Sequence, residues 1–329
     1  MGESGIDNLP IIRKPVLVSI IIPVYNKAAF VRETLDSALG QTYPNIEVVL
    51  VNDGSTDRSL AILKEYQSKF PDKIILIDQA NGGVSKATNV GIQASSGAYI
   101  QFLDADDLLS PDKIENQVRL LEGNSPFVMA SCEWVNFKND ISEFSRFHYG
   151  VFEDFETGLD WLLHSWIKQE MMADSSWLTS RNLVELAGPW DESLTINQDG
   201  EFFMRVLLKS EKVIFDSKSK AYYRTLNETS VSKQQSYLAA QSLLASFRKY
   251  QIEILNVEDT KSVRLALKRV YMKFIYDVYP MFPDLLKNAK DLMWKLDVNE
   301  KIFIGGPKFQ ILSMLIGFEN ALRLKRILQ

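Results

Sequence analysis

Four short apolar runs in the first third of the chain, separated by helix-like stretches, constrain the fold more than any other feature. The runs cover 16–23, 46–52, 73–78 and 98–103, and the stretches between them lie at about 28–41, 56–69 and 85–95. Strands that are apolar at nearly every position are covered on both faces, and helical crossovers make neighbouring strands parallel. We therefore predict a doubly wound α/β fold with a mostly parallel sheet flanked by helices.

Polar residues follow each predicted strand, at the edge of the sheet where such folds bind ligands. Asp53 ends the second run, so it is either a turn residue before Gly54 or a carboxylate that accepts a hydrogen bond from a ligand. Gly83 completes a Gly-Gly pair before the third helix, and such a pair lets a phosphate approach the backbone. Lys86 can add positive charge there, and a simple loop remains the alternative for this segment.

Three carboxylates crowd the end of the fourth predicted strand, at Asp104, Asp106 and Asp107. Like charges this close repel and raise each other's pKa, so the cluster is costly without a positive partner. A hard divalent cation binds one or two carboxylates and shares its remaining positions with phosphate oxygens and water. The alternative is a solvated loop in which Asp107 caps a helix that starts near Pro111.

A later acidic segment, Asn197–Phe203, reads as the start of an amphipathic helix that continues through Leu208. Asp199 lies near the expected N-terminus, where the helix dipole would keep its carboxylate ionised. An aspartate in a first turn is also common for capping alone.

Together these segments resemble the inverting glycosyltransferases of family 2, which have the GT-A fold. The matching strings, in the order of that family, are SIIIPVYN, VLVNDGSTD, NGGVSKATNVGI, YIQFLDADD and NQDGEFFMR, and they cover about 19–206. The resemblance implies that Asp53 contacts the nucleotide base and that Pro23 and Tyr25 line the base pocket. It implies that Asp104 and Asp106 form the DxD motif, with Asp106 the direct ligand of Mn²⁺ or Mg²⁺.

The resemblance also assigns roles in the second half of the chain. It places the catalytic base at Asp199, where Gln198 replaces the first member of an acidic pair, and Glu201 matches a further acidic position. Trp177 precedes the acceptor-side loop, and Arg224 belongs to a late segment that closes over the diphosphate. One departure is that the usual Ala-Arg-Asn reads Ala87-Thr88-Asn89 here, which puts nucleotide affinity or preference in doubt.

The expected organisation has four parts. A disordered N-terminal tail at 1–15 precedes a nucleotide-sugar-binding half at 16–120. An acceptor-side half with the catalytic base spans 121–230, and a helical C-terminal region spans 231–329. We expect these parts to transfer a sugar with inversion from a nucleotide sugar to an acceptor hydroxyl, in cell-surface polysaccharide or glycolipid synthesis. A carboxylate at Asp53 suits a base N–H, so UDP- or dTDP-sugars are favoured.

Two other classes of function compete with this interpretation. A phospho-acceptor receiver domain also has an aspartate at a central strand end, but it needs an acidic pair after its first strand, where this chain has Pro23-Val24-Tyr25. A noncatalytic nucleotide-sugar-binding protein is disfavoured because Asp104, Asp106 and Asp199 are all present. The net charge of -5 gives no basic field, so we expect no nucleic-acid partner.

The sequence also gives expectations about location. The first fifteen residues hold no apolar core of signal-peptide length, and no apolar run reaches the roughly 18 residues of a membrane span. We therefore expect a cytoplasmic protein. The segment 309–329 is apolar with a late Arg323, Lys325 and Arg326 cluster. It is either a helix that closes the fold or a peripheral contact with the inner face of the plasma membrane.

Overall fold

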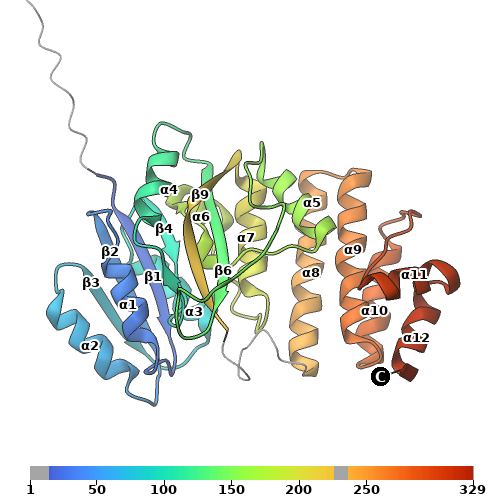
Figure 1. Cartoon of the computed structure of the whole chain (residues 1–329), viewed down its shortest axis with the longest axis horizontal. Coiled ribbons are helices and arrows are strands. Elements are labelled where there is room, and N and C mark those ends of the chain that lie inside the picture. The colour runs from blue at the N-terminus through green and yellow to red at the C-terminus, as the bar shows by residue number, and fades with distance from the viewer. Residues whose placement is uncertain (1–14, 226–235, 329) are drawn as a thin grey trace, which may run out of the picture.

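The computed structural model describes residues 15–225 and 236–328. Figure 1 shows a sheet-bearing part that holds the first two thirds of the chain and a row of helices beyond it. Most of the expected tail at 1–15, and the expected boundary near 230, lie outside the described residues. The division into four parts therefore stays a prediction.

The first sheet is the predicted doubly wound sheet. Its strand order is β3-β2-β1-β4-β8, and all pairs are parallel except β4 with β8. The bounds are β1 (Val18–Val24), β2 (Ile46–Asp53), β3 (Ile74–Gln79), β4 (Tyr99–Phe102) and β8 (Thr179–Ser180). The four predicted strands are therefore confirmed to within a few residues at each end.

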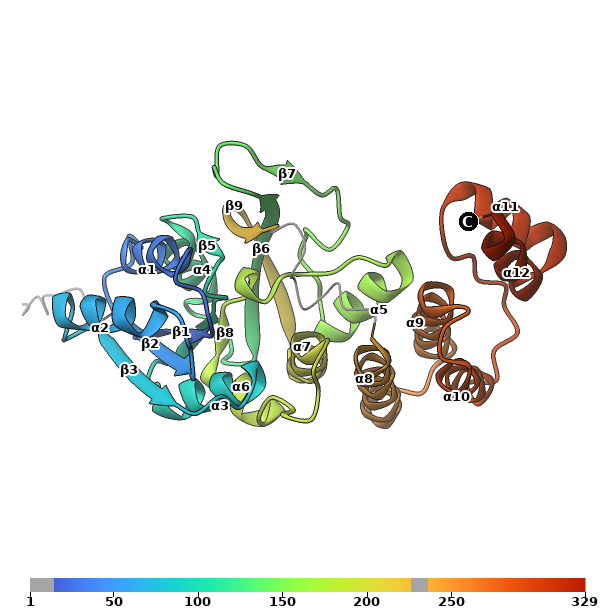
Figure 2. The ribbon, with the colours of Figure 1, turned by 90° about the horizontal axis from the view of Figure 1, so that it is seen from below.

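Both faces of this sheet are buried, because alternate residues of each strand point to opposite sides. Ile20 and Ile22 join a core cluster with α1 (Val31–Leu39) and α2 (Ser59–Lys69), whereas Ile21 belongs to the cluster that contains Ala87 of α3 (Val84–Ala94). Figure 2 shows α1 on one side of the sheet and α3 on the other.

A second sheet continues the fold, with strand order β5-β9-β6-β7. Its bounds are β5 (Leu108–Leu109), β6 (Val128–Phe137), β7 (Ser145–Arg146) and β9 (Lys212–Arg224). The sequence near 126–137 and at 212–217 has the apolar pattern of strands, and these segments form β6 and the first half of β9. The register between β6 and β9 shifts after Cys132, which pairs with Asp216, to Glu133, which pairs with Lys220. This bulge extends β9 to Arg224 and carries that residue to the ligand-binding edge.

The remaining helices flank these sheets or follow them. α4 (Lys113–Leu121) packs on β6 and β9, and α7 (Gln198–Lys209) packs against α5, α6 and α8. The others are α5 (Gly158–Lys168), α6 (Arg181–Ala187), α8 (Tyr237–Val257), α9 (Lys261–Val278), α10 (Pro283–Trp294), α11 (Pro307–Ile316) and α12 (Phe318–Leu328), with a single 3₁₀ turn, η1, at Asp174–Ser176.

The last two helices, α11 and α12, dock on α9 through Tyr276. Phe309 of α11 packs edge-on against the Tyr276 ring at 4.8 Å, and the Lys325 ammonium of α12 lies 3.7 Å from the centre of the same ring. Across residues 15–225 and 236–328, every helix falls short of the length and apolarity that crossing a bilayer requires.

Candidate active site

The carboxyl ends of β1 and β4, the end of β9 and the N-terminus of α7 enclose a cleft of about 480 Å³, here called the carboxylate cleft. Pro23, Asp104, Asp106, Asp199 and Arg224, five of the residues that the sequence singled out, line it. The structure thus gathers residues separated by up to two hundred positions at the sheet edge where α/β folds bind ligands.

The pKa of Asp104, the first acid of the DxD pair, is shifted by its surroundings. Burial, with the nearby charges of Asp106 and Asp199, raises the pKa of Asp104 to about 7, although the Lys27 ammonium acts in the opposite direction. Sequence analysis missed a further member of this group, Asp174 of η1, which also lines the cleft. Burial and the charge of Asp104 raise the pKa of Asp174 well above its ordinary value.

Lys27 is the positive partner that the sequence did not identify. Its ammonium lies 2.5 Å from Oδ2 of Asp106, and Lys27 lines the carboxylate cleft. The residue follows the first predicted strand directly, so its place in the string VYNK was an available signal. Lys86, to which we had assigned added charge, is exposed and is not among the residues that line the cleft.

Asp107 is neither in a solvated loop nor a helix cap. It is buried, and its Oδ1 accepts a hydrogen bond from the backbone amide of Arg224 at 2.8 Å, while Asp112 precedes α4. The guanidinium of Arg224 donates to the carbonyl of Asp106 at 2.8 Å and forms an ion pair with Glu33 at 2.7 Å. Arg224 thus ties the end of β9 to the acidic loop.

Asp53 organises the glycine loop beside the cleft. Its Oδ1 accepts hydrogen bonds from Gln79 and from the Gly82 amide, both at 2.8 Å, and its Oδ2 accepts one from the Gly83 amide at 2.9 Å. Gly83 adopts φ +90°, a conformation that only glycine takes readily. Asp53 is buried, whereas Tyr25, which follows the neighbouring strand β1, is 49% exposed.

Asp199 sits in the first turn of α7, as predicted, at a corner fixed by α8. Asn197 before it has a left-handed backbone, and its side-chain amide donates to Ser246 and Tyr250, both at 2.8 Å. A Cβ at Gly200 would lie 2.6 Å from the Tyr250 hydroxyl, so only glycine permits this approach. Asn197 is a positioning residue that the sequence did not single out.

The electrostatics of Asp199 differ from the expectation. Burial raises the pKa of Asp199, and hydrogen bonds from the amides of Gly200 and of Asp199 itself oppose the shift without cancelling it. The helix N-terminus is therefore a smaller influence than desolvation. A carboxylate with a raised pKa is a stronger base once it is ionised.

Two predicted substrate-binding residues lie elsewhere. Trp177 is 1% exposed and stacks on Phe203 at 5.7 Å, in the wall of a neighbouring cavity. Glu201 is 3% exposed and forms an ion pair with Arg205 at 2.8 Å, outside the carboxylate cleft. The structure gives both residues packing contacts and does not bring them to Asp104 and Asp106.

The donor set at Asp104 and Asp106 fits a divalent cation that is shared with a ligand. No cluster of three or more histidine, cysteine or acidic side chains could hold a metal within residues 15–225 and 236–328. Two crowded carboxylates beside an open cleft match the way Mg²⁺ is held, by one or two carboxylates with phosphate oxygens completing its shell. Burial is the largest cause of the raised pKa of Asp104 and the charge of Asp106 adds to it; a cation would relieve this second contribution.

Comparisons with known proteins agree with this geometry. The model of Glycosyl transferase family 2 matches residues 19–176. An uncharacterized glycosyltransferase of Rickettsia typhi, RT0329, is 33% identical over 88% of this chain and 87% of its own length. Glycosyltransferase GlyA of Streptococcus pneumoniae is 34% identical over 63% of this chain and 30% of its own length.

A solved structure has the same fold. Residues 1–349 of S. aureus TarS, crystallised with UDP-GlcNAc, superpose with a TM-score of 0.70 and 20% identity, covering 85% of this chain and 81% of that one. At this identity the likeness concerns the α/β arrangement and the helices that follow it.

Proposed function

We propose, from the premise that this chain belongs to glycosyltransferase family 2, that it transfers a sugar with inversion from a UDP- or dTDP-sugar to an acceptor hydroxyl. The observation that carries the proposal is the meeting of Asp104, Asp106 and Asp199 in one cleft. The family excludes the receiver-domain alternative. A noncatalytic nucleotide-sugar-binding protein remains the outcome against which the proposal is tested.

The nucleotide would lie over the glycine loop and Asp53. Both oxygens of Asp53 accept hydrogen bonds from Gln79 and the glycine loop, so a uracil or thymine N–H would share or replace one of them. TarS was crystallised with UDP-GlcNAc and UDP, and a mannosyltransferase of Pyrobaculum calidifontis with GDP-Man and Mn²⁺. These complexes support a nucleotide-sugar donor and leave the choice of base to experiment.

Asp104 and Asp106 would hold Mn²⁺ or Mg²⁺, which offsets the charge of the departing diphosphate. Lys27, already paired with Asp106, adds a positive charge on the same side. Asp199 would accept the proton of the acceptor hydroxyl as that oxygen attacks the anomeric carbon. The leaving diphosphate and the base then stand on opposite sides of the sugar, and this single displacement inverts the anomeric centre.

The test measures donor turnover. A thermal-shift screen of nucleotide sugars, with and without Mn²⁺, identifies the donor, and release of the nucleoside diphosphate then measures hydrolysis. We expect stabilisation by uridine or thymidine donors and slow Mn²⁺-dependent hydrolysis. Stabilisation by guanosine or cytidine donors alone would refute the choice of base, and tight donor binding without turnover under any acceptor would favour the noncatalytic alternative.

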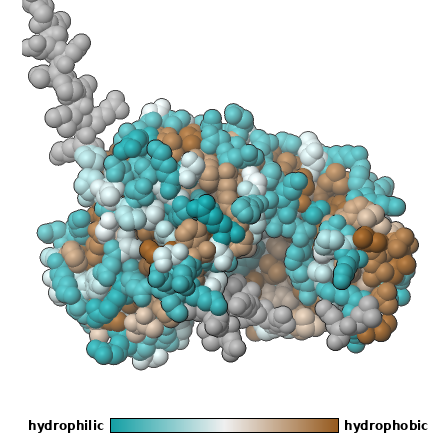
Figure 3. Space-filling view, in the orientation of Figure 1, coloured by the Kyte–Doolittle hydropathy of each residue, from teal (hydrophilic) through white to brown (hydrophobic). Residues whose placement is uncertain are grey.

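We also propose that the α11–α12 pair contacts an anionic membrane surface, which would place the enzyme at the cytoplasmic face. α11 buries Phe309 and Ser313 but exposes large apolar side chains, among them Leu315 at 77%. The segment 301–329 has five lysines and arginines against one glutamate, whereas the whole chain has a net charge of -5. Figure 3 shows apolar residues gathered at the end of the molecule formed by the last helices. Exposed apolar and basic side chains together favour anionic lipid.

Sedimentation with phosphatidylglycerol vesicles tests this contact, with phosphatidylcholine vesicles as the comparison. We expect wild-type protein to pellet with the anionic vesicles at low salt and the Leu315→Ser variant to pellet less. Val257→Ser, which changes an apolar residue that is 50% exposed at the end of α8, should bind like wild type. Equal recovery of wild type in the supernatant with both lipids would contradict the contact.

A further inference from the structure

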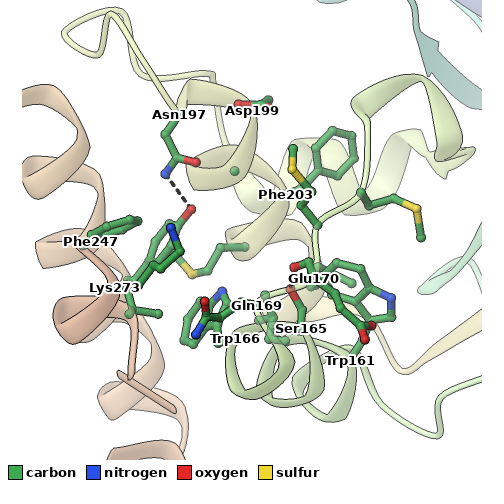
Figure 4. Close-up of a pocket in the computed structure, with 18 of the residues that line it drawn as sticks. Trp161, Ser165, Trp166, Gln169, Glu170, Asn197, Asp199, Phe203, Phe247 and Lys273 are labelled. Atoms are coloured by element: carbon green, nitrogen blue, oxygen red, sulfur yellow. Dashed lines mark hydrogen bonds between the residues drawn. The ribbon is translucent and has the colours of Figure 1, made fainter. Parts of the chain in front are cut away.

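A second cavity adjoins the carboxylate cleft and is here called the aromatic cavity. It encloses about 380 Å³ between α5, α7, α8 and α9. It shares Met171, Asn197 and Asp199 with the carboxylate cleft, so the base stands in the wall between the two. Figure 4 shows Asn197 and Asp199 at one end of this cavity and Trp166 and Gln169 at the other.

The lining is suited to a ring. Six aromatic residues contribute to it: Trp161, Trp166, Trp177, Phe203, Phe247 and Tyr250. Trp166 is only half-buried and stacks on Tyr250 with an interplanar angle of 8° and a centroid distance of 5.0 Å. Trp166 therefore presents an aromatic surface to the cavity and is not fully packed into the core.

Two cations of α9 stand at the cavity, four residues apart on one helix face. Arg269 has no carboxylate within ion-pairing distance in the part of the chain that the structure describes. With the Gln169 amide turned so that its oxygen faces the guanidinium, Arg269 donates to it at 3.2 and 3.3 Å. Lys273 is paired with Asp277 at 2.5 Å.

The two acids that line the cavity, Glu170 and Asp199, do not pair with Arg269. Glu170 accepts a hydrogen bond from the Val151 amide at 3.0 Å and lies 3.6 Å from His164. Asp199 is the assigned base. Burial lowers the pKa of Arg269 without depriving it of its charge, since an arginine stays protonated far above neutral pH. Arg269 is thus a cation held at a cavity without a counter-charge.

We infer that the aromatic cavity is the acceptor site and that it takes an anionic glycan, a sugar or polyol ring followed by a phosphate. The inference rests on the proposed function. The ring that carries the reacting hydroxyl would lie by Asp199 against the aromatic wall, and Arg269 and Lys273 would bind the phosphate. A phosphodiester chain and a lipid diphosphate both offer this chemistry.

Binding is measured first, because it does not depend on turnover. Three of the six tryptophans of the chain line the cavity, so acceptor binding should change the intrinsic fluorescence. A glycerol-phosphate oligomer and a sugar diphosphate on a short isoprenoid are titrated beside a neutral disaccharide. We expect one of the two phosphate-bearing compounds to bind at least tenfold more tightly than the disaccharide, and which one does so identifies the source of the phosphate. Equal or absent binding of all three would overturn the inference, even if donor hydrolysis is intact.

The variants Arg269→Gln and Lys273→Gln locate the phosphate. We expect each to raise KM for the phosphate-bearing acceptor about tenfold, equivalent to about 1.4 kcal/mol, with kcat and donor hydrolysis unchanged. The control is Lys261→Gln, an exposed lysine of α9 that does not line the cavity. The KM of Lys261→Gln should equal that of wild type. If Arg269→Gln and Lys273→Gln have the same KM as Lys261→Gln, the two cations do not bind the phosphate. Loss of donor hydrolysis in wild type would instead count against the proposed function.

Discussion

The carboxylate cleft and the aromatic cavity meet at Asp199 but are built differently. The cleft is formed by strand ends and the short loops that follow them, and five buried or half-buried acids line it together with Lys27 and Arg224. The cavity is formed by the faces of four helices and is mostly apolar, with two cations of α9 at its wall. We therefore expect charge to dominate ligand binding on one side of the base, and aromatic surface with two cations to bind the ligand on the other.

The largest expected effect is a loss of turnover at Asp199, in the wall between the cleft and the cavity. Asp199→Asn keeps the shape of the side chain and removes its basicity, so turnover should fall by roughly 100- to 10,000-fold, about 3 to 5 kcal/mol of barrier. Donor affinity should survive, because Asp104 and Asp106 are untouched. Steady-state kinetics and donor calorimetry measure the two effects.

Glu201→Gln is the matched control for Asp199→Asn. Glu201 lies two residues along the same helix but pairs with Arg205 outside the cleft. We expect this variant to be less stable and still active. If Glu201→Gln is dead while Asp199→Asn turns over within a few-fold of wild type, the base has been assigned to the wrong residue.

The next effect concerns how the buried ammonium of Lys113 lowers the free energy of unfolding. Lys113 is fully buried, donates to Gln101 at 2.5 Å and to Gln117 at 2.7 Å, and burial lowers the pKa of Lys113 to about 8. Below pH 8 Lys113 is protonated in both the folded and the unfolded state, and burying its charge lowers the free energy of unfolding by the full amount. Between pH 8 and about 10.5 only the unfolded state keeps the proton, so stability rises with pH.

Urea unfolding of wild type and Lys113→Met across this pH range tests the prediction. The free energy of unfolding of wild type should gain about 3 kcal/mol relative to the variant, because a shift of one pKa unit corresponds to about 1.4 kcal/mol. Other titrations cancel in the difference. Parallel pH profiles for the two proteins would show that Lys113 is not the group responsible.

A smaller loss is expected at the DxD motif. Asp106→Ala removes a proposed metal ligand and the partner of Lys27, so Mn²⁺ should no longer strengthen donor binding by the tenfold or more typical of a disturbed metal site. Calorimetry with UDP, with and without Mn²⁺, makes the measurement. Asp72→Ala, an exposed acid before β3, controls for net charge. An undiminished Mn²⁺ effect in Asp106→Ala would remove Asp106 from the metal site.

A last effect, of comparable size, is expected at the exposed rim of the cleft. If the half-exposed ring of Tyr25 stacks on the nucleotide base, Tyr25→Ala should weaken UDP binding by roughly 1 to 3 kcal/mol and Tyr25→Phe should not. The same titration resolves both variants. Wild-type affinity in Tyr25→Ala would leave base recognition to Asp53 and the glycine loop.

The two regions also differ in how far the sequence could predict them. Asp53, Asp104 and Asp106 follow parallel strands that share an edge, so the sequence could predict that edge as the site, although Asp53 lies beside the cleft and does not line it. Asp174 was not predicted, because a 3₁₀ turn is too short to show a hydrophobic period in the sequence. Arg224 was recognised only through resemblance, since the bulge in β9 that carries it has no simple periodic pattern.

The aromatic cavity could not be predicted from local patterns. Trp166, Tyr250 and Arg269 lie on three helices, and an amphipathic pattern does not specify which helices will face one another. Aromatic residues are frequent between 134 and 190, and the structure buries Trp177, at 1% exposure. Trp166 stays half-buried and stacks on Tyr250 of α8, a contact that no local pattern around residue 166 specifies.

The position of Asp199 between two separately built chambers has an evolutionary consequence. Among the residues that the structure describes, those that line the carboxylate cleft all come before residue 226, whereas the aromatic cavity also uses residues after 236, namely Phe247, Tyr250, Arg269, Val270 and Lys273. A lineage could therefore exchange or remodel its C-terminal third and acquire a new acceptor while inheriting its donor chemistry intact. Chimaeras joined within 226–235 would be the laboratory equivalent of that inheritance.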